Sequence, residues 1–509
     1  MFTPTIENMT PDKVMRKDPF RRMRPSARLE ALSEGFSMTP PPNIEGVVLY
    51  YYPTYADFLR EQDVNGHRIM SKEWYPDIVR YDEEKKGYFT RKVARVTTNL
   101  PEVFASQRTS MLTGDRVDLK LVSGGDSKGN QALLTEYVEG WEYKDIEKAV
   151  YDLIWYCNIV VDCAIVFFLD NGRLGWRSLS YPKGDVLYPH YNSFGRLCLF
   201  GRRYDVIEDG VSVEYLEVWD DKDYIRYRVS PDGGDDGLSP GWAIDQPAIP
   251  HNFPRCPVAY HRAKDTVAGP AMGLLDNFDL AMSQLCENNK AYALRIFYAL
   301  GSDVDIEASI DGRPMTVTSM DVNSKVGFLE PAESSGSFEL QMKQLLKSAY
   351  QAAHCTEPTE IKSGADISSL TVQMLSKDSY HQALLDAKEF QPALNDIVDL
   401  FKHGYSVELG KPSKFTNLRI KGTINPYIMR SEVEEVNNIS ILKAAGAIPV
   451  KAAANEAAKL GYGTPRNYEE ILQEQHDELI AEQEAQQTTS SVQNARQNPV
   501  AQSRVNNAE

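Results

Sequence analysis

Residues 267–295 read VAGPAMGLLDNFDLAMSQLCENNKAYALR, and this stretch decides the architecture of the chain. Its apolar side chains recur every three or four positions, which predicts one amphipathic helix. The stripe consists of Leu274, Phe278, Ala281, Met282, Leu285 and Tyr292. At a rise of 1.5 Å per residue, the 29 residues would extend about 43 Å. This helix is the first of two that organise the second half of the chain.

A second long helix follows a short insertion. Ser337 is a plausible N-cap for a helix over residues 336–354. Its apolar stripe consists of Phe338, Met342, Leu345, Leu346, Ala349 and Ala353. Residues 296–335 between the two helices are predicted to form short strands and turns. Two long helices with a small subdomain at their tip suit a spoke of an assembly better than a cleft enzyme, and contacts around a closed ring would be heterologous.

The pattern of residues 46–265, which precede the first long helix, predicts a mixed α+β domain. Residues 145–161 form a helical pattern that leads into a strand over Ala164–Leu169. Asp170-Asn171-Gly172 then supplies the turn residues of a tight hairpin. Alternating runs from Leu197 to Val229 predict an antiparallel meander.

A polar loop, a third long helix and a helical end follow the second helix. The third helix covers about Ser369–His403 and contains Pro392, so we expect a kink there. Phe415–Ile424 is predicted to be a returning strand. Ser431 and Glu434 form a capping box, Gly446 closes that helix, Pro449 opens the next and Gly461 closes it, and a third is expected from Thr464-Pro465. The tail 486–509 is rich in Gln, Asn and Ser and is predicted to be disordered.

The first 45 residues are predicted to form an irregular arm. Its basic side chains are Lys13, Arg16, Lys17, Arg21, Arg22, Arg24 and Arg28. Such an arm could grip a neighbouring subunit or a nucleic acid, or it could be a solvated terminus. Both interpretations stay open at the level of sequence.

The composition is that of an ordinary globular protein. Of 509 residues, 42% are hydrophobic and 25% are charged. The 55 Lys and Arg against 72 Asp and Glu give a net charge of −17, so the surface as a whole gains no counterion-release affinity for nucleic acid. Six cysteines without a C-x-x-C pair indicate reduced thiols and a cytoplasmic compartment. No secretory signal is visible, and Leu153–Leu169, which carries Asn158 and Asp162, is expected to be a buried helix and strand rather than a membrane span.

The motifs of common enzymes are missing from the sequence. Gly124–Gly129 resembles a P-loop only in composition. Asp220, Asp221 and Asp223 could suggest a metal-dependent nuclease, but an exposed hairpin turn is the better interpretation. We therefore expect no catalytic residue, no metal site and no cofactor.

Several local patterns resemble the portal proteins of tailed bacteriophages, of the siphovirus type. The resemblance spreads over residues 46–485. It rests on a helix ending at Gly114 before a Val-containing strand, on Arg203-Tyr204 and Glu217-Val218-Trp219 in the meander, on Leu274-Leu275-Asp276-Asn277-Phe278-Asp279, on the helix, loop and helix from Leu345 to Leu370, and on Ala444–Pro449.

The resemblance implies an α+β subunit of several domains. After the arm (1–45) come a mixed wing (46–266), a stem helix (267–295), a β-rich clip (296–335) and a second stem helix (336–354). A tunnel loop (355–369), a long wing helix with the returning strand (370–428), a helical crown (429–485) and the tail (486–509) complete the chain. The subunit is expected to assemble as a cyclic ring.

The resemblance also implies a function and partners. The ring, a homo-oligomer of twelve copies in the virion, would be the channel for double-stranded DNA during packaging and ejection. Its expected partners are the terminase large subunit, a head-completion adaptor, and the major capsid and scaffold proteins. The expected location is the portal vertex of the virion, and the host cytoplasm during assembly, with no membrane contact. ATP hydrolysis would belong to a separate motor subunit.

Two groups of site residues follow from these implied domains. The DNA-facing residues of the tunnel loop would be Glu357, Glu360, Lys362, Ser363, Gly364 and Asp366. The partner-docking residues of the clip would be Asp303, Asp305, Glu307, Asp311, Arg313, Asp321 and Lys325. Two alternatives stay open: another minor head or connector protein without a channel, and a nuclease that uses Asp220–Asp223.

Overall fold

A computed structural model describes most of the chain, and the chain divides into two compact units. Described are residues 4–15, 24–26, 49–51, 53–82, 86–122, 128–229, 241–293, 296–300, 304–307, 316–319, 325–329, 335–357, 376–427, 432–459, 473 and 476. Unit 1 contains Met1–Lys362 and Leu375–Tyr427, and unit 2 contains Ser363–Met374 and Ile428–Glu509.

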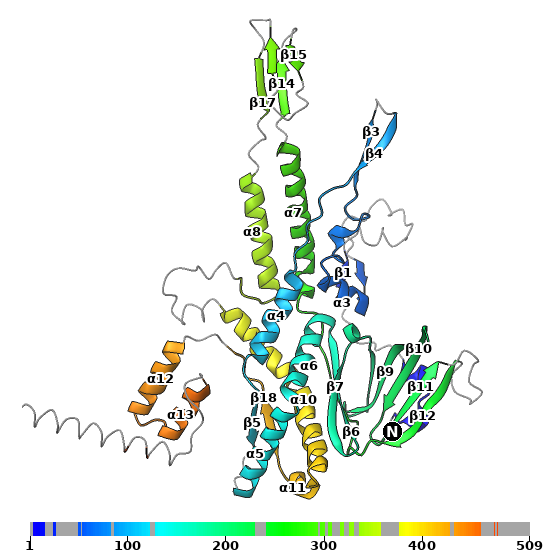
Figure 1. The fold of residues 1–509 in the computed structure, drawn as a ribbon, viewed down its shortest axis with the longest axis vertical. Helices are drawn as coiled ribbons and strands as arrows, with labels where there is room; N and C mark the ends of the chain where they lie inside the picture. The colour runs from blue at the N-terminus through cyan, green and yellow to red at the C-terminus, as the bar shows by residue number, and fades with distance from the viewer. Residues whose placement is uncertain are drawn as a thin grey trace, which may run out of the picture. The chain divides into compact units, whose positions relative to one another are not determined.

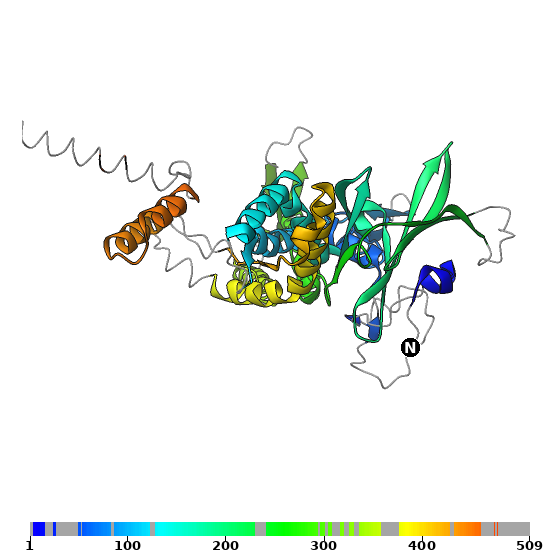
Figure 2. The same ribbon diagram turned by 90° about the horizontal axis from the view of Figure 1, so that it is seen from below.

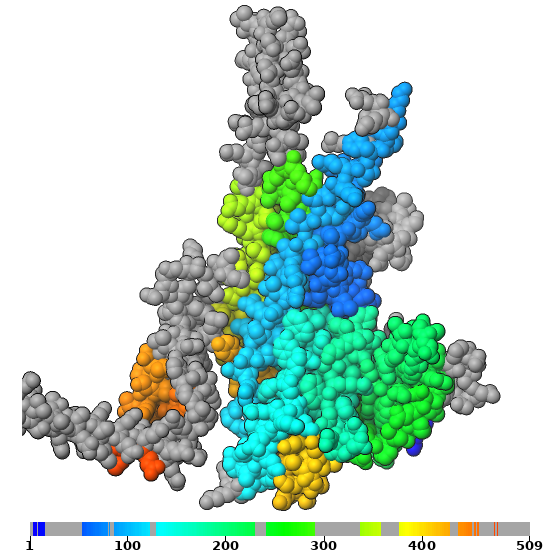
Figure 3. All heavy atoms as spheres, in the orientation of Figure 1, coloured from blue at the N-terminus to red at the C-terminus, as the bar shows by residue number. Residues whose placement is uncertain are grey.

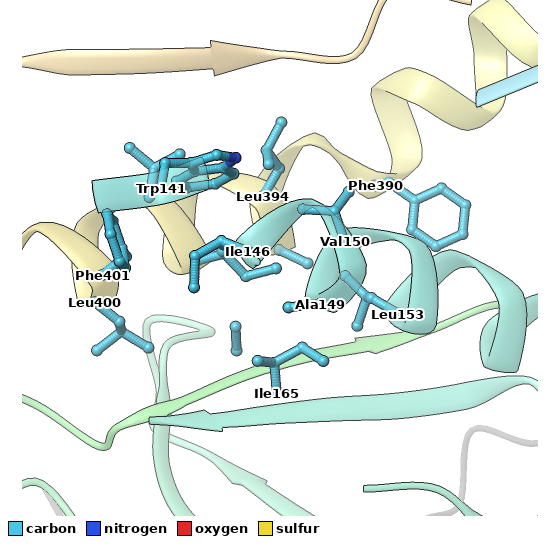
Figure 4. Close-up of a cluster of buried hydrophobic side chains, with 14 of the residues drawn as sticks. Trp141, Ile146, Ala149, Val150, Leu153, Ile165, Phe390, Leu394, Leu400 and Phe401 are labelled. Atoms are coloured by element: carbon cyan, nitrogen blue, oxygen red, sulfur yellow. The ribbon is translucent and has the colours of Figure 1, made fainter. Parts of the chain in front are cut away.

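The largest core of unit 1 lies between helices and a three-stranded antiparallel sheet (Figure 4). The sheet has the order β13-β6-β7 and consists of β6 (Asp162–Asp170), β7 (Arg173–Leu179) and β13 (Val258–Arg262). The helices are α5 (Lys128–Tyr143), α6 (Ile146–Val160) and α10 (Lys377–Glu408). Their fully buried side chains include Trp141, Ile146, Leu153 and Phe401, which pack over Ile165 of β6. Apolar residues at helical spacing on α6 and a continuous apolar run on β6 therefore meet in one core.

The junctions of β6 are specific turns. Asn171 (φ 49°) and Gly172 (φ 78°) join β6 to β7, so the predicted tight hairpin is confirmed. Val161 (φ 68°) ends α6, an unfavourable conformation for a β-branched residue. Its amide donates to the Cys157 carbonyl (3.1 Å) and its carbonyl accepts from the amide of Ala263 (2.7 Å), which hold it there.

A five-stranded antiparallel meander forms the second sheet. It has the order β12-β11-β10-β9-β8 and consists of β8 (Val186–Tyr191), β9 (Leu197–Glu208), β10 (Val211–Trp219), β11 (Asp223–Val229) and β12 (Trp242–Pro250). Phe200 and Trp219 face β6 and β13 in one buried cluster. Leu199 and Leu216 point to the other face. The predicted meander is confirmed and gains one strand at each edge.

The described part of the N-terminal segment covers that other face (Figure 2). It comprises η1 (Ile6–Asn8) and α1 (Pro11–Val14). Val14 is 1% exposed, and a Cβ on Gly201 would lie 2.5 Å from its Cγ1, so this sheet position accepts only glycine without rearrangement. The amide of Ile6 donates to Asp220 Oδ2 (3.1 Å). Residues 4–15 thus pack on their own subunit, whereas the basic residues 16, 17, 21, 22 and 28 lie outside the described residues.

Unit 1 also contains a helix followed by a two-stranded sheet. α4 (Leu100–Thr113) leads to β5 (Asp118–Leu121), which pairs with β18 (Ile420–Thr423). Gly114 keeps a right-handed helical conformation (φ −67°), so it does not act as a left-handed cap. Glycine is needed there because an added Cβ would lie 2.8 Å from Tyr427.

The two long helices pack against each other (Figure 1). They are α7 (Met272–Ala293), preceded by η4 (Gly269–Ala271), and α8 (Ser335–Ala352). α7 begins five residues later than predicted, because Pro270 lies in the preceding 3-10 turn. Ser337 lies inside α8, so its predicted capping role is wrong. Two strand pairs lie between the helices: β14 (Ile296–Leu300) with β17 (Lys325–Leu329), and β15 (Val304–Glu307) with β16 (Thr316–Ser319).

Smaller elements precede α4. β1 (Arg24–Ser26) pairs with β2 (Leu49–Tyr51), and α3 (Tyr55–Gln62) and η2 (Arg68–Met70) follow. β3 (Ile78–Asp82) and β4 (Gly87–Arg91) form a hairpin that projects at the surface (Figure 3). The remaining short turn is η3 (Tyr181–Lys183).

The chain after α10 differs from the sequence prediction in one place. Pro412 begins the short helix α11 (Pro412–Thr416), where a strand was expected to include Phe415. Phe415 is 1% exposed, so its apolar character reflects the core rather than a strand. Only Ile420–Thr423 is a strand. Pro392 lies inside α10, where its nitrogen has no hydrogen to donate.

The described part of unit 2 is a pair of helices, α12 (Glu432–Ala444) and α13 (Val450–Lys459). Gly446 (φ 69°) follows α12 and the Ala447 amide donates to the Leu442 carbonyl (3.0 Å), so the predicted glycine stop is confirmed. Pro449 accepts from Ala453 (3.0 Å) at the start of α13. Ser431, Gly461, the helix expected from Thr464 and the tail lie outside the described residues.

Candidate functional site

The end of α8 and the beginning of α10 both contact α4, and residues 358–375 connect them in the sequence. α8 ends because His354 adopts φ 52° and the amide of Cys355 donates to the Tyr350 carbonyl (2.9 Å). We call the polar cluster at this junction the loop base. It consists of Gln107, Arg108, Ala353, Cys355, Thr356, Ser379 and Asp386.

Arg108 is the centre of the loop base. Its Nε donates to Asp386 Oδ2 (2.8 Å), its Nη2 contacts the same oxygen, and its Nη1 donates to the Ala353 carbonyl (3.1 Å). Gln382 Nε2 donates to the other carboxylate oxygen of Asp386 (2.9 Å). Arg108 and Asp386 are 8% and 7% exposed, so neither charge could be removed alone without leaving its partner buried and unpaired.

Two hydroxyl groups meet between the residues that flank the 358–375 segment. Thr356 Oγ1 lies 2.9 Å from Ser379 Oγ, and both residues are buried. The Thr356 carbonyl accepts from Gln107 Nε2 of α4 (3.3 Å). The loop base therefore holds together the described residues on either side of the segment.

The thiol of Cys355 is part of this packing. Its sulfur lies 3.7 Å from the Phe104 carbonyl. Burial raises the pKa of the Cys355 thiol to about 12, against the opposing charge of Arg108. A thiol with so little thiolate at neutral pH is a poor nucleophile, so it packs rather than reacts.

The structure places only one of the predicted tunnel-loop residues. Glu357 is half-buried at the end of the loop base. The others, Glu360, Lys362, Ser363, Gly364 and Asp366, lie outside the described residues.

The predicted clip residues are placed in part, by backbone alone. Asp305 and Glu307 lie on β15, opposite Thr318 and Thr316, and Lys325 begins β17. Asp303, Asp311, Arg313 and Asp321 lie outside the described residues. The described strands thus put two acidic positions, two residues apart, on one strand.

The Asp220–Asp223 cluster has a structural role. The predicted hairpin turn is present between the antiparallel strands β10 and β11, but the Asp220 side chain is buried (6% exposed) and not exposed as expected. Its Oδ1 accepts from the amides of Lys222 (2.8 Å) and Asp223 (2.7 Å), and its Oδ2 accepts from Ile6. Asp221 Oδ1 accepts from the amide of Cys256 (3.1 Å) and from Arg196 (3.1 Å). Carboxylates committed to amides in this way are poorly suited to hold a catalytic metal.

Among the residues that the structure describes, no group of three or more His, Cys, Asp or Glu side chains is arranged to hold a metal ion. No helix in the same residues has both the length and the apolarity needed to cross a bilayer.

Sequence reasoning missed Arg108 and Asp386, although a signal was present. Arg108 falls on the face of α4 that also carries Phe104 and Leu112, four residues to either side and both buried. Asp386 falls between Ala383 and Phe390 on the buried face of α10. One arginine and one aspartate within two apolar stripes indicate a buried ion pair.

Comparisons with known proteins give a family and likenesses to solved structures. A family model described as "Phage portal protein, SPP1 Gp6-like" matches residues 50–487. No curated protein matches the chain. Among solved structures, a chain of the "Neck of empty GTA particle computed with C6 symmetry" is 13% identical, with a TM-score of 0.37 over 71% of this chain and 89% of that chain.

Proposed function

The chain belongs to the phage portal proteins of the SPP1 Gp6-like family, whose model spans residues 50–487, and from this premise we propose that it forms the channel for double-stranded DNA at one vertex of the capsid. Portal proteins are structural components of the phage virion. The proposed assembly is a closed ring of about twelve copies joined by heterologous contacts. It would form in the host cytoplasm before the head is filled.

The residues around 355–369 are proposed to face the DNA. Lys362 is the only basic residue there and stands near Glu357, Glu360 and Asp366 in the sequence. A single lysine among carboxylates would touch phosphates only briefly. Glycine has the fewest backbone restrictions of any residue, so Ser363-Gly364 is the place in this stretch where a change of backbone conformation would cost least. A chain with a net charge of −17 suits a channel, because strong phosphate contacts would hinder sliding.

The β-rich insertion between α7 and α8 is proposed to dock other proteins. Its acidic positions Asp303, Asp305, Glu307, Asp311 and Asp321 outnumber Arg313 and Lys325. An acidic surface of this kind fits a basic partner surface. The proposed partners are the terminase large subunit during packaging and a head-completion adaptor afterwards, while the major capsid and scaffold proteins would contact the rest of the ring.

The loop base is the observation that best supports a channel role. The contacts of Arg108, and of Thr356 with Ser379, hold the residues that flank the segment 358–375 in one buried cluster. A segment that must contact moving DNA needs fixed ends to keep its place. For the wing, crown and tail, the proposed roles rest only on membership of the family.

The mass of the purified assembly tests this proposal. Twelve copies of 57.4 kDa give about 689 kDa in native mass spectrometry. A species of that mass, or one subunit more or fewer, with a central channel in electron micrographs, is the expected result. A stable dimer or tetramer that persists when scaffold protein is added would contradict it and would favour a minor head protein without a channel.

A further inference from the structure

One face of α7 binds an extended segment that lies about 180 residues earlier in the sequence. The segment is residues 91–98, which link the β3–β4 hairpin to α4. The acceptors on α7 are Asp279, Ser283 and Glu287. They receive hydrogen bonds from the Thr98 hydroxyl (3.0 Å), the Val96 amide (2.9 Å) and the Ala94 amide (2.5 Å), in that order.

The spacing of the acceptors along α7 matches the spacing of the donors along the segment. The acceptors are four residues apart on a helix, which is about 6.0 Å along the axis. The donors are two residues apart on an extended chain, which is about 6.6 Å. The segment runs opposite to α7, since the later acceptor takes the earlier donor. Arg91 extends the series, because its Nη2 donates to Glu287 Oε2 (2.8 Å).

His67 is the side chain that completes this series at the Asp279 end. Its Nδ1 lies 2.9 Å from Asp279 Oδ2 and its Nε2 lies 3.1 Å from the Glu61 carbonyl. The side chains of His67 and Asp279 are 2% and 1% exposed. The Glu61 carbonyl can only accept a hydrogen bond, so Nε2 carries a proton, and Nδ1 carries one as well when Asp279 is in its carboxylate form. This geometry fits an imidazolium paired with a carboxylate.

The charged groups around His67 come from three elements. α7 contributes Asp279 and Asp276, and η2 contributes Arg68, whose Nη1 lies 3.3 Å from Asp276 Oδ2. α3 contributes Glu61, whose carboxylate accepts from the Thr266 hydroxyl (3.0 Å). Burial by itself would lower the pKa of His67, but the hydrogen bond and charge of Asp279 outweigh it and raise the pKa. Burial also raises the pKa of Asp276 to about 6, although Arg68 opposes this.

We propose that His67 is a positioning residue whose protonated ring fastens residues 91–98 to α7, and that loss of this proton releases the segment from the helix. A neutral ring has one nitrogen that cannot donate, so one of its two acceptors would lose its partner inside the protein. Asp279 would then lose the contact that orients it toward Thr98. The proposal rests on these contacts, and only the description of α7 as a stem helix depends on the proposed function.

Hydrogen exchange of the full-length protein, measured by mass spectrometry from pH 6 to 9, tests whether residues 91–98 detach from α7 when His67 loses its proton. After correction for the intrinsic rate, the peptide containing the amides of Ala94 and Val96 is expected to lose protection as the pH rises. The loss should approach tenfold per pH unit between the ordinary histidine pKa and the raised pKa of His67 in the folded state, and it should level off above the latter. Peptides from β6 and β7 serve as an internal reference and should keep their protection throughout.

Two variants identify the proton. His67→Gln keeps an amide donor without a titratable group, and Asp279→Asn keeps an acceptor for Thr98 without the charge. Both should show low protection at Ala94 and Val96 that no longer changes with pH. His190→Gln is the matched control, because His190 is half-buried on β8, its Nε2 lies 2.7 Å from the Val14 carbonyl, and its pKa is lowered by burial. It should behave like the wild type.

The outcomes separate cleanly. Constant protection of Ala94 and Val96 in the wild type up to pH 9 would overturn the proposal without any variant. An unchanged pH dependence in His67→Gln would overturn it as well. Neither result bears on the ring, whose mass is measured separately, so this test and the test of the proposed function fail independently.

Discussion

Thr356 and Ser379 are 23 positions apart in the sequence, yet their hydroxyl oxygens lie 2.9 Å apart. The bond joins two described residues on either side of the 358–375 segment. Closing a loop costs conformational entropy, which this bond and the other contacts of the loop base offset in the folded protein. The two hydroxyl groups therefore contribute to the stability of unit 1, and on the proposed function they also hold the flanks of the DNA-facing residues.

Ser379→Ala is expected to lower the free energy of unfolding by about 1 kcal/mol, because it removes one buried hydrogen bond. Urea denaturation measures this loss. Ser110→Ala is the matched control, since the Ser110 hydroxyl donates to the Gln107 carbonyl (2.9 Å) at an exposed position of α4. Equal losses in the two variants would show that the closure contributes nothing.

Arg108→Met is expected to cost about 3–5 kcal/mol, because it leaves the Asp386 carboxylate buried without a counter-charge. The double variant Arg108→Met/Asp386→Leu should recover most of that loss, since an apolar pair can replace a buried ion pair. A double-mutant cycle in urea gives the coupling. Lys343→Ala, which breaks an exposed pair with Glu339 on α8, should leave stability unchanged. Additive losses in the cycle would contradict the assignment of Arg108 and Asp386 as a pair.

Gly140→Ala is expected to destabilise the protein by about 1–3 kcal/mol, although alanine favours helices. A Cβ at this position of α5 would lie 2.3 Å from the ring of Tyr405 on α10. Gly129→Ala, on the same helix with nothing within 4 Å, should instead stabilise by about 0.4–1 kcal/mol. Thermal melting compares the two. A stabilising Gly140→Ala would mean that α5 and α10 are further apart than described.

Lys362→Glu tests the proposed DNA contact. If Lys362 touches phosphates in passing, the reversal should slow packaging or shorten the packaged DNA while the ring still assembles. Packaging assays with purified procapsids, and the length of the packaged DNA, measure the effect. Lys222→Glu, at the turn between β10 and β11, makes the same change of charge at an exposed position elsewhere in unit 1. Normal packaging by Lys362→Glu would refute the contact.

Most elements of unit 1 could be predicted because their signals are local. The stripe of α7, the alternation in β9 and β10, and Asn171-Gly172 each describe only their own neighbourhood. Element ends were less certain, and Phe415 was misassigned, because an apolar residue looks the same in a strand and in a short buried helix. Gly114 was expected to end α4 by its conformation, whereas the side chain of Tyr427, more than 300 residues later, is what requires it.

The sequence by itself determined the periodicities, the turns and the family, since each is written in residues a few positions apart or in their order along the chain. Only the tertiary structure decided which polar groups meet. Arg108 finds Asp386 and His67 finds Asp279 across 278 and 212 positions. A charge pays a desolvation penalty on burial that only a well-placed partner offsets, and the position of that partner depends on the packing of whole helices. For this reason the loop base and the contacts of residues 91–98 with α7 could be identified only in the tertiary structure and not from any sequence motif.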